Sequence, residues 1–306
     1  MSRFIASLNA FVVLICALLG FYSAPTNGGF TNKDWMSAID DETKINAISI
    51  PGTHDSCALY EPIDSVAKCQ DYTVADQLDM GVRFLDLRCF VIGKKIMMCH
   101  DVILQGKYLN EILDDCISFL KENPTETVIV SIRDEKKPSS VNFSSMVEGI
   151  IEKNKDMWYT QNALPKLGEV RGKLVLFNRF TKENEIGLQA ASWRDNDEFK
   201  IYNWTYYISV QDNYDIGTDI EKKWEAVKRQ FYRAQYNNNY DSDTLFINFI
   251  SGYITEGLLP NLSVAAKELN ARTNSYLDGA GKICTGIVVF DFVTQELCDK
   301  VIKTNF

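Results

Sequence analysis

Short apolar runs alternate with amphipathic segments along the chain from residue 44 onward. The apolar runs predict strands at about 44–50, 82–89, 95–99, 127–132, 173–177, 207–210, 244–249 and 286–292. Between them, apolar positions spaced three and four residues apart predict helices near 73–80, 109–120, 140–153, 219–236, 262–270 and 294–303. Residues 181–206 have neither period, so we expect a loop there.

Strands that alternate with helices are typical of right-handed βαβ units and a parallel sheet. Eight strands in about 260 residues predict an α/β fold, a single TIM-type (β/α)8 barrel that could be distorted. No internal repeat or shift in composition marks a second domain. A doubly wound open sheet is the structural alternative, but it gives no reason for a polar group at the end of every strand.

The first 24 residues differ from the rest of the chain. Arg3 is their one charged residue, residues 11–19 are apolar, and small residues surround Ser23 and Ala24. This pattern is typical of a secretory signal peptide, and the apolar run is short for a membrane span. We therefore expect a signal peptide at 1–24, a catalytic domain at 25–306, and secretion or delivery to an endomembrane lumen. A retained signal anchor is the alternative.

The charge balance limits the partners of the chain. The 306 residues carry a net charge of −9, and residues 25–306 hold 31 Lys and Arg against 41 Asp and Glu. An excess of negative charge argues against nucleic-acid binding and against tight electrostatic attachment to anionic membranes.

Seven cysteines remain after the expected signal peptide, which suits a disulfide-permissive compartment. The near pairs Cys57–Cys69, Cys89–Cys99 and Cys284–Cys298 are candidates, although spacing alone does not give connectivity. Because the count is odd, one thiol stays free, and Cys116 on the apolar face of a helix is our candidate. The chain has no CxxC spacing typical of zinc sites. Three glycosylation sequons begin at Asn142, Asn203 and Asn261. In a secreted eukaryotic glycoprotein they would mark surface positions, although chance alone supplies two or three such triplets.

Polar and charged residues follow nearly every predicted strand. The chain has only two histidines, His54 and His100, and each lies just past an apolar run. The other residues at strand ends are Asp55, Asp86, Arg88, Arg133, Glu135, Asn178, Arg179, Gln211, Asp212, Tyr214, Asn248 and Asp291. In an α/β barrel the chemistry lies at the carboxyl ends of the strands. The pattern therefore favours a two-histidine acid–base site over separate structural histidines and ion pairs.

Five segments carry a family resemblance. They are residues 49–56 (SIPGTHDS), 81–88 (GVRFLDLR), 123–131 (NPTETVIVS), 210–214 (VQDNY) and 246–249 (FINF). With them the chain resembles the bacterial-type phosphatidylinositol-specific phospholipase C family, the X-domain barrel, over nearly all of residues 25–306. The resemblance implies a secreted enzyme that cleaves phosphatidylinositol, glycosylphosphatidylinositol (GPI) anchors or both into diacylglycerol and inositol 1,2-cyclic phosphate.

The resemblance also implies catalytic roles. His54 matches the general base, which takes a proton from the inositol 2-hydroxyl, and His100 matches the general acid. Arg88 matches the arginine that stabilises the phosphate. Asp291 matches the carboxylate that orients the base, and Asp55 matches the carboxylate that supports the acid. An imidazole with its ordinary pKa of about 6.5 suits both proton transfers near neutral pH.

Further residues match substrate contacts. Arg133, a lysine in the bacterial pattern, Arg179 and Asp212 match contacts to inositol hydroxyls, and Tyr214 matches the ring that stacks on the inositol. Asp86 shares one face of its strand with Arg88, so we place it in the same substrate site. The family often has His-Gly where this chain has His100-Asp101, a change that alters the loop beside the general acid.

Calcium-dependent relatives have an asparagine after the first histidine and acidic ligands in strands two and four. Here those positions match Asp55, Arg88 and Arg133, and guanidinium groups cannot ligate calcium. We therefore expect no metal and no cofactor. The expected partner is the inositol lipid or GPI-anchored substrate, met in transient peripheral contact with a membrane by a monomer. The alternatives are a non-catalytic inositol-lipid-binding barrel and a metal-dependent phosphodiesterase of the glycerophosphodiester or sphingomyelinase D type.

Overall fold

The computed structural model describes residues 29–64, 66–135, 142–181, 185–238, 243–255 and 259–306. The expected signal peptide, 1–24, lies outside these residues. The chain divides into two units, Met1–Thr31 and Asn32–Phe306, and the fold below is that of the second unit. Among its described helices, none is both long and apolar enough to cross a membrane.

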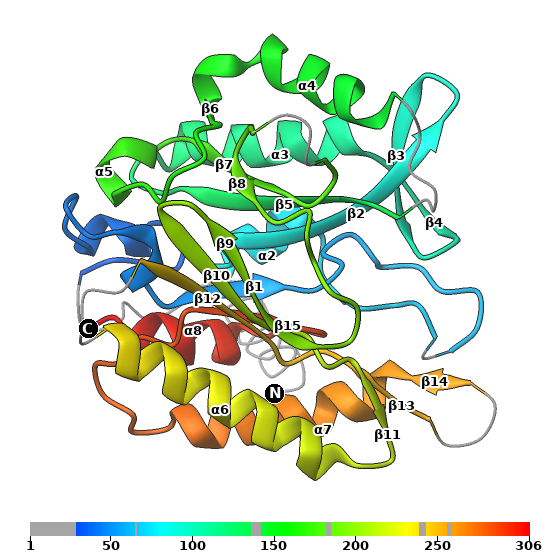
Figure 1. Ribbon diagram of the computed structural model, residues 1–306, viewed down its shortest axis with the longest axis vertical. Coiled ribbons are helices and arrows are strands. Elements are labelled where there is room, and N and C mark those ends of the chain that lie inside the picture. Colours follow the sequence, from blue (N-terminus) through cyan, green and yellow to red (C-terminus); the bar gives the residue numbers. More distant parts are fainter. Residues whose placement is uncertain (1–28, 65, 136–141, 182–184, 239–242, 256–258) are drawn as a thin grey trace, which may run out of the picture. The chain divides into compact units, whose positions relative to one another are not determined.

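One large, mainly parallel sheet organises the unit (Figure 1). Its main path runs β6 (Trp158–Tyr159), β7 (Leu174–Asn178), β5 (Val128–Asp134), β2 (Phe84–Ile92), β1 (Ile50–Thr53), β15 (Ile287–Phe290), β12 (Thr244–Phe249), β10 (Tyr206–Gln211) and β9 (Glu198–Asn203). Neighbours are parallel as far as β10, and β9 joins antiparallel. The first and last of the predicted strands pair with each other, as in a barrel and not as in a doubly wound sheet. Within the described residues no ladder joins β7 to β10, so the α/β barrel is distorted and open there.

Helices cover the sheet on both sides in Figure 1, with α3 and α4 on one side and α6, α7 and α8 on the other. The helices are α2 (Val74–Asp79), α3 (Leu109–Glu122), α4 (Phe143–Lys153), α5 (Leu167–Val170), α6 (Ile220–Asn238), α7 (Leu262–Leu277) and α8 (Gln295–Lys303). Short 3-10 turns form η1 (Trp35–Ala38), η2 (Ile45–Ala47) and η3 (Lys155–Met157). The predicted apolar face of α3, including Leu109, Leu113 and Cys116, is buried as expected.

The third predicted strand is not a barrel strand. β3 (Lys95–His100) pairs antiparallel with β2, and β4 (Ile103–Tyr108) pairs antiparallel with β3. Residues Gly93 and Lys94 connect the paired ends Ile92 and Lys95, and Gly93 has a φ of +61°. A two-residue connection with a glycine in the left-handed region is suited to a hairpin and is too short for a parallel crossover. The prediction of a third parallel strand was therefore wrong.

The first strand begins later than predicted. Much of 44–50 forms η2, and β1 starts at Ile50, so Pro51 and Gly52 lie inside the strand instead of ending it. Pro51 still accepts a hydrogen bond from the Arg83 amide at 2.9 Å. A Cβ on Gly52 would lie 3.0 Å from the Cβ of Phe84, so a glycine lets β1 and β2 approach closely.

The predicted loop at 181–206 also contains strands. β8 (Leu188–Gln189) joins β7, and β9 pairs with β10 as a hairpin. A second small sheet consists of β11 (Asp215–Gly217), β13 (Tyr253–Thr255) and β14 (Pro260–Asn261). Buried and exposed residues alternate along β9, as in a strand with one buried face. The pattern covers only six residues, so it does not stand out in the sequence.

All seven described cysteines are free and buried, so none of the candidate near pairs is a disulfide. The register explains one case: Cys89 pairs with Met98, which offsets Cys99 by one residue and turns its side chain to the other face. Cys116 is free as expected. Of the three sequons, Asn203 is 8% exposed and donates a hydrogen bond to the Gln189 carbonyl at 2.9 Å. The fold therefore hides the amide that a glycan would need at Asn203.

Candidate active site

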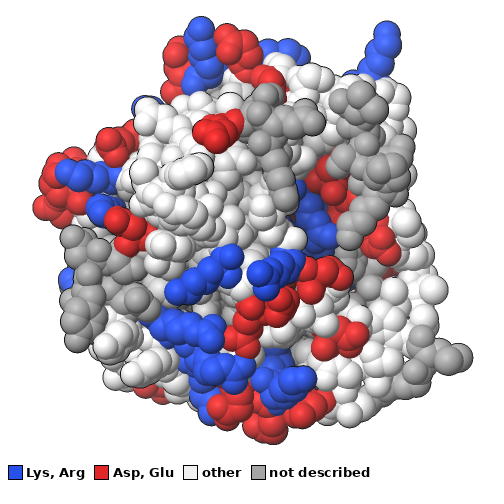
Figure 2. Space-filling view, viewed as in Figure 1, with Lys and Arg blue, Asp and Glu red and all other residues white. Residues whose placement is uncertain are grey.

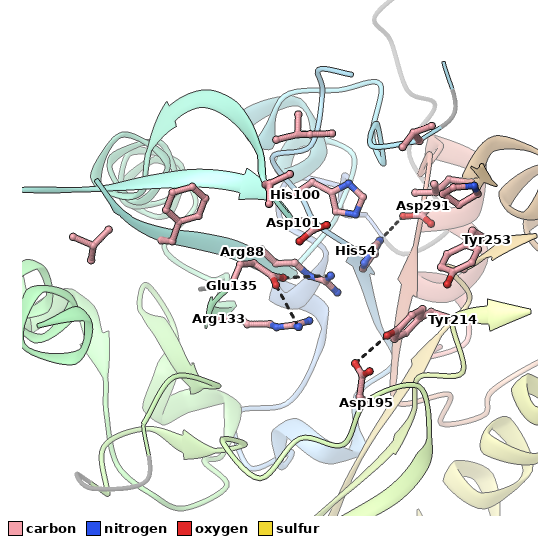
Figure 3. Close-up of a pocket in the computed structure, with 18 residues that line it drawn as sticks. His54, Arg88, His100, Asp101, Arg133, Glu135, Asp195, Tyr214, Tyr253 and Asp291 are labelled. Carbon is pink, nitrogen blue, oxygen red and sulfur yellow. Dashed lines mark hydrogen bonds and ion pairs between the residues drawn. The ribbon is translucent and has the colours of Figure 1, made fainter. Parts of the chain in front are cut away.

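The pairing of β1 with β15 positions the first histidine. Their parallel register joins Thr53 to Phe290, so the next residues, His54 and Asp291, emerge side by side at the carboxyl ends of both strands. His54 Nδ1 and Asp291 Oδ1 are 2.7 Å apart, and Asp291 is 1% exposed (Figure 3). Because a carboxylate only accepts a hydrogen bond when ionised, this contact places a proton on Nδ1 and leaves Nε2 free to accept one.

The β2–β3 hairpin brings the second histidine back to the same place. His100 ends β3, and its Nε2 lies 3.9 Å from Asp55 Oδ2. The two histidine rings are 6.2 Å apart between centroids and meet edge to face. The adjacent residues His54 and Asp55 thus serve different partners, as the resemblance implied. Asp55 is fully buried, and neither of its carboxylate oxygens has a hydrogen-bond partner.

Left-handed backbone conformations surround this pair of histidines. Asp55, Asp101 and Phe292 have φ values of +38°, +50° and +47°. Such conformations cost energy in residues other than glycine and often occur where an active site needs an unusual backbone path. At Asp101 the conformation explains the departure from His-Gly, because aspartate tolerates the left-handed region better than most side chains do.

Two carboxylates hold Arg88 in place. Its Nε donates to Asp86 Oδ2 at 3.0 Å, and its Nη1 lies 3.5 Å from Glu135 Oε1. Arg133 Nη2 reaches the other oxygen of Glu135 at 3.3 Å. Burial alone would raise the pKa of Asp86, but Arg88 and then Arg179 outweigh it and hold that pKa well below its usual range. Asp86 is therefore an anion that fixes the guanidinium groups around it.

Arg179 and Asp212 lie deeper than the other predicted substrate residues. Arg179 Nη1 contacts Asp86 Oδ1 at 3.0 Å, and its guanidinium lies 3.8 Å from the ring centre of Trp193. The same Trp193 donates to Asp212 Oδ2 at 2.9 Å. Arg179 is 7% exposed and Asp212 is 4% exposed. The half-buried Trp193 therefore stands between these two residues and the solvent.

A cavity of about 800 Å³ opens above the histidines. His54, His100, Arg88, Arg133 and Asp291 line it together, and Asp55, Asp86, Arg179 and Asp212 are buried. Tyr214 lines the opposite wall beside Tyr253, with ring centroids 6.0 Å apart, and donates to Asp195 Oδ1 at 2.9 Å (Figure 3). The structure thus gathers all ten predicted site residues around one cavity: six line it, and four are buried around it.

Burial shifts the pKa values of the second histidine and its carboxylate in opposite directions. Burial lowers the pKa of His100 to about 3, with further lowering by the charges of His54 and Arg88. Burial raises the pKa of Asp55 well above its usual value. Both shifts disfavour the charged forms, so a negative group beside His100 is needed to favour its imidazolium.

The residues at the calcium position of the metal-dependent pattern do not fit a calcium ion. Arg88 and Arg133 stand at positions where that pattern has acidic ligands. The carboxylates beside them, Asp86 and Glu135, are paired with the guanidinium groups of Arg88, Arg133 and Arg179. Calcium needs six to eight oxygen ligands, about 2.3–2.6 Å from the ion. A fixed guanidinium occupies the place where that charge would act.

Several site residues were absent from the sequence prediction. Gln70 donates to the His54 carbonyl at 2.8 Å and to the Phe290 carbonyl at 2.9 Å, which ties β1 to β15. Glu135 was noted at a strand end but given no role. Trp193 and Cys69 also lie at the site, on long connections that no periodic pattern assigns.

The fold and the site together define an α/β-barrel protein with a two-histidine acid–base centre beside a guanidinium that can receive an anionic group. Residues 49–180 match the family described as "Phosphatidylinositol-specific phospholipase C, X domain". The chain is 30% identical to a 1-phosphatidylinositol phosphodiesterase of Staphylococcus aureus, over 100% of both chains. It is 27% identical to a Listeria monocytogenes protein of the same name, over 96% of each.

Solved structures agree with this match. A mutant of the phosphatidylinositol-specific phospholipase C from Staphylococcus aureus superposes with a TM-score of 0.80 and 28% identity, over 90% of this chain and 98% of the other. The Listeria monocytogenes phospholipase gives a TM-score of 0.76 at 27% identity, over 90% and 100%. The chain belongs to the phosphatidylinositol-specific phospholipase C X-domain family.

Proposed function

We propose that the chain is a phosphatidylinositol-specific phospholipase C that works without a metal ion. Its products are diacylglycerol and inositol 1,2-cyclic phosphate, formed from phosphatidylinositol or from GPI anchors. The observation that supports this most is the pair of histidines, each with its own buried carboxylate, facing one cavity with Arg88 in its wall.

The first proton transfer uses His54. Asp291 holds the Nδ1 proton, so Nε2 takes the proton of the inositol 2-hydroxyl. The freed oxygen attacks phosphorus and closes the five-membered cyclic phosphate. The bond from phosphorus to the glycerol oxygen breaks in the same displacement.

The second transfer uses His100. The bound phosphate brings a negative charge beside the ring, which favours the imidazolium form of His100 over the neutral ring that burial favours. His100 then donates a proton to the departing glycerol oxygen. Because the leaving alkoxide is neutralised as it departs, diacylglycerol is released without a metal ion.

Arg88 meets the charge that develops on the phosphate oxygens. Two carboxylates already orient its guanidinium, so little reorganisation is needed when the substrate enters. On the opposite side, Tyr214 offers a ring face to the inositol, and Arg133 and Asp195 offer a donor and an acceptor to its hydroxyls. We assign Arg179, Asp212 and Asp86 to the support of this surface, because they are buried beneath it.

An apolar rim beside the cavity suits transient contact with a membrane. It consists of Leu59, Tyr60, Ile63, Val102 and Leu104, whose exposures run from 37% for Leu59 to 78% for Val102. Two hydrogen bonds between the backbone of Tyr60 and the Gln105 amide, at 2.9 and 3.1 Å, join the β1–α2 connection to β4. The two segments therefore present one surface. One structure of the Staphylococcus aureus relative concerns modulation of that protein's membrane binding.

The aromatic segment at 193–207 is less suited to this role. Trp193 is part of the site, and Trp204 lies in the β9–β10 turn, at the amino end of β10 and away from the cavity. On the face in Figure 2, acidic and basic side chains are intermixed, with no single basic field of the kind that nucleic acid requires. Apolar contact, and not charge, is therefore the expected attachment.

The deciding experiment measures inositol 1,2-cyclic phosphate release from phosphatidylinositol vesicles and from a GPI-anchored protein, with EDTA and with added calcium. We expect equal rates in both conditions, and near-complete loss in His54→Ala and His100→Ala while circular dichroism shows a retained fold. Activity that requires calcium or magnesium would support the metal-dependent phosphodiesterase instead. Binding of the lipid without turnover would support the non-catalytic barrel.

The rim has its own test. Val102→Asp should lower vesicle binding and vesicle hydrolysis about tenfold, because a charge replaces an apolar contact worth about 1–2 kcal/mol. Hydrolysis of a short-chain, monomeric substrate should stay unchanged. Equal losses on both substrates would contradict the rim. Trp204→Asp, at the other end of the strands, is the matched control.

A further inference from the structure

One cysteine lies between the two histidine–carboxylate pairs. Two groups of metal-ligand side chains come together among the described residues: His54, Cys69 and Asp291, and Asp55, Cys69 and His100. In each group, one ligand atom from every residue lies within 4.8 Å of the others. Cys69 belongs to both groups, and it is fully buried. No spacing along the chain indicates this cluster, because Cys69 is not part of a CxxC or Cys–His motif.

The two groups differ in readiness for an ion. His54 and Asp291 already share a hydrogen bond at 2.7 Å. Two ligands of one tetrahedral zinc ion lie farther apart, about 3.3 Å, because each bond is about 2.0–2.1 Å long. His100 Nε2 and Asp55 Oδ2 are 3.9 Å apart, too far for a hydrogen bond and close to the separation of two zinc ligands.

Asp55 supplies the independent observation. It is fully buried, and neither carboxylate oxygen has a hydrogen-bond partner. A buried carboxylate without partners is costly, and a bound cation removes that cost. His100, with 17% of its side chain exposed, lines the cavity, so an ion can reach the site from the cavity and keep water as a fourth ligand.

We propose that Asp55, Cys69 and His100 form an inhibitory site for zinc or a similar thiophilic divalent cation. The imidazole, thiolate and carboxylate set is typical of zinc and excludes calcium and magnesium. The ion binds Cys69 as a thiolate and Asp55 as a carboxylate, so the protons that these groups carry pass to solvent as the metal bonds form. The positive charge of Arg88 repels the ion, so the site needs the negative charge of the Cys69 thiolate to bind it. A ring whose Nε2 binds the ion cannot become an imidazolium, so His100 cannot act as the general acid and hydrolysis stops; this consequence rests on the proposed function, whereas the binding does not.

Cys69 also packs with Ala58 and Leu262 in a small apolar cluster, which is a purely structural role. The experiment separates the two roles with cobalt as a spectroscopic probe. EDTA-treated, dialysed full-length chain is titrated with Co²⁺ and the thiolate-to-cobalt charge-transfer absorption is recorded. We expect one Co²⁺ per chain, displacement by Zn²⁺, inhibition of cyclic phosphate release by Zn²⁺, and recovery with EDTA.

The variants complete the design. Cys69→Ala should lose the charge-transfer band and lose the Zn²⁺ inhibition seen in the parent, each measured against the variant's own metal-free rate. If circular dichroism shows that the alanine variant does not fold, Cys69→Ser replaces it. Cys116→Ala, a buried thiol on α3, is the matched control and should behave as the parent chain.

Two results would overturn the site: a charge-transfer band that persists without Cys69, or Zn²⁺ inhibition that is equal in parent and variant. The band does not depend on catalysis. A chain that shows the band but cleaves no inositol lipid would retain this site and lose the proposed function. A chain that cleaves the lipid but shows no band would do the reverse.

Discussion

Replacing Asp291 with asparagine tests how the base is held. The change keeps the size of the side chain but removes the charge that holds the proton on His54 Nδ1, across a contact of 2.7 Å at a site that is 1% exposed. The asparagine amide can instead donate to Nδ1, which places the ring proton on Nε2. That tautomer cannot accept the proton of the 2-hydroxyl.

The magnitude follows from two contributions. A hydrogen bond to a charged group contributes about 1.5–3 kcal/mol, which corresponds to a rate loss of roughly 10- to 150-fold. The wrong tautomer adds to this loss, and a comparable Asp-to-Asn change in a catalytic triad costs about 10⁴-fold. We therefore expect kcat to fall by about 10²–10⁴-fold with KM nearly unchanged, because Asp291 acts on the base and not on the head group.

The assay combines steady-state release of cyclic phosphate with nitrogen NMR of ¹⁵N-histidine-labelled chain. Since the chain has only two histidines, the spectrum reports the tautomer of each ring directly. Asp299→Asn, at a hydrogen-bonded carboxylate in α8, is the matched control. The reasoning is refuted if Asp291→Asn keeps kcat within about fivefold of the parent, or if the His54 tautomer does not change while kcat falls.

Three further predictions follow from the site and its surroundings. Arg88→Lys keeps the charge but loses the fork that Asp86 orients, so kcat should fall by about 10²–10³-fold, and a rate near that of the parent would contradict the role of the guanidinium. Asp101→Gly removes a left-handed aspartate (φ +50°) and should raise the free energy of unfolding by about 0.5–1 kcal/mol in urea titrations. Asp114→Gly, at an exposed position of helix α3, should lower it by about as much. Burial lowers the pKa of Lys223 to about 7, so above pH 7 the unfolded chain binds the extra proton and stability rises with pH. Lys223→Met lacks that rise. From pH 7 to 10 the free energy of unfolding of the parent should therefore increase by roughly 2–4 kcal/mol relative to that of the variant. If the difference between the two free energies does not change with pH, the lowered pKa is refuted.

Hydrophobic period predicted the helices and barrel strands because these elements bury one face or both faces against the same core. The face of α3 and the apolar runs at β5, β12 and β15 are examples. The period cannot distinguish a parallel barrel strand from a hairpin partner, since both alternate in the same way. For β3 the distinguishing signal was the two-residue connection at Gly93 and Lys94, which is too short for a crossover.

The two central pairs of the site were predictable for a physical reason. Closing a barrel requires the first and last strands to pair, and that pairing brings His54 to Asp291 across 237 residues. Period two likewise placed Asp86 and Arg88 on one face of β2. The position of Trp193 over Arg179 was not predictable, because a long connection with no period determines it.

The segments that carry the family resemblance also contain residues with a purely structural role. Arg83 belongs to the second matching segment, yet it is fully buried and pairs with Glu126 of the third at 2.9 Å. Its remaining donors reach the carbonyls of Leu78, Val82, Asn32 and Lys33. Such a fully bonded pair fixes β2 against β5 at the end remote from the cavity. A match to a family segment therefore identifies a fold contact as readily as a catalytic group.

The charges around the cavity support both proposals, catalysis without calcium and inhibition by zinc. Asp86 and Glu135 are ion-paired with arginines, which opposes a hard cation between them and holds Arg88 beside the cavity. Asp55 differs from both, because neither of its oxygens has a hydrogen-bond partner and its nearest ion-pair partner among the described side chains is His100 at 3.9 Å. The acid pair needs that looseness, since a tight ion pair would hold the proton that His100 must donate. The same looseness, next to the Cys69 thiol, creates room for a soft cation, so catalysis and metal sensitivity have one structural origin.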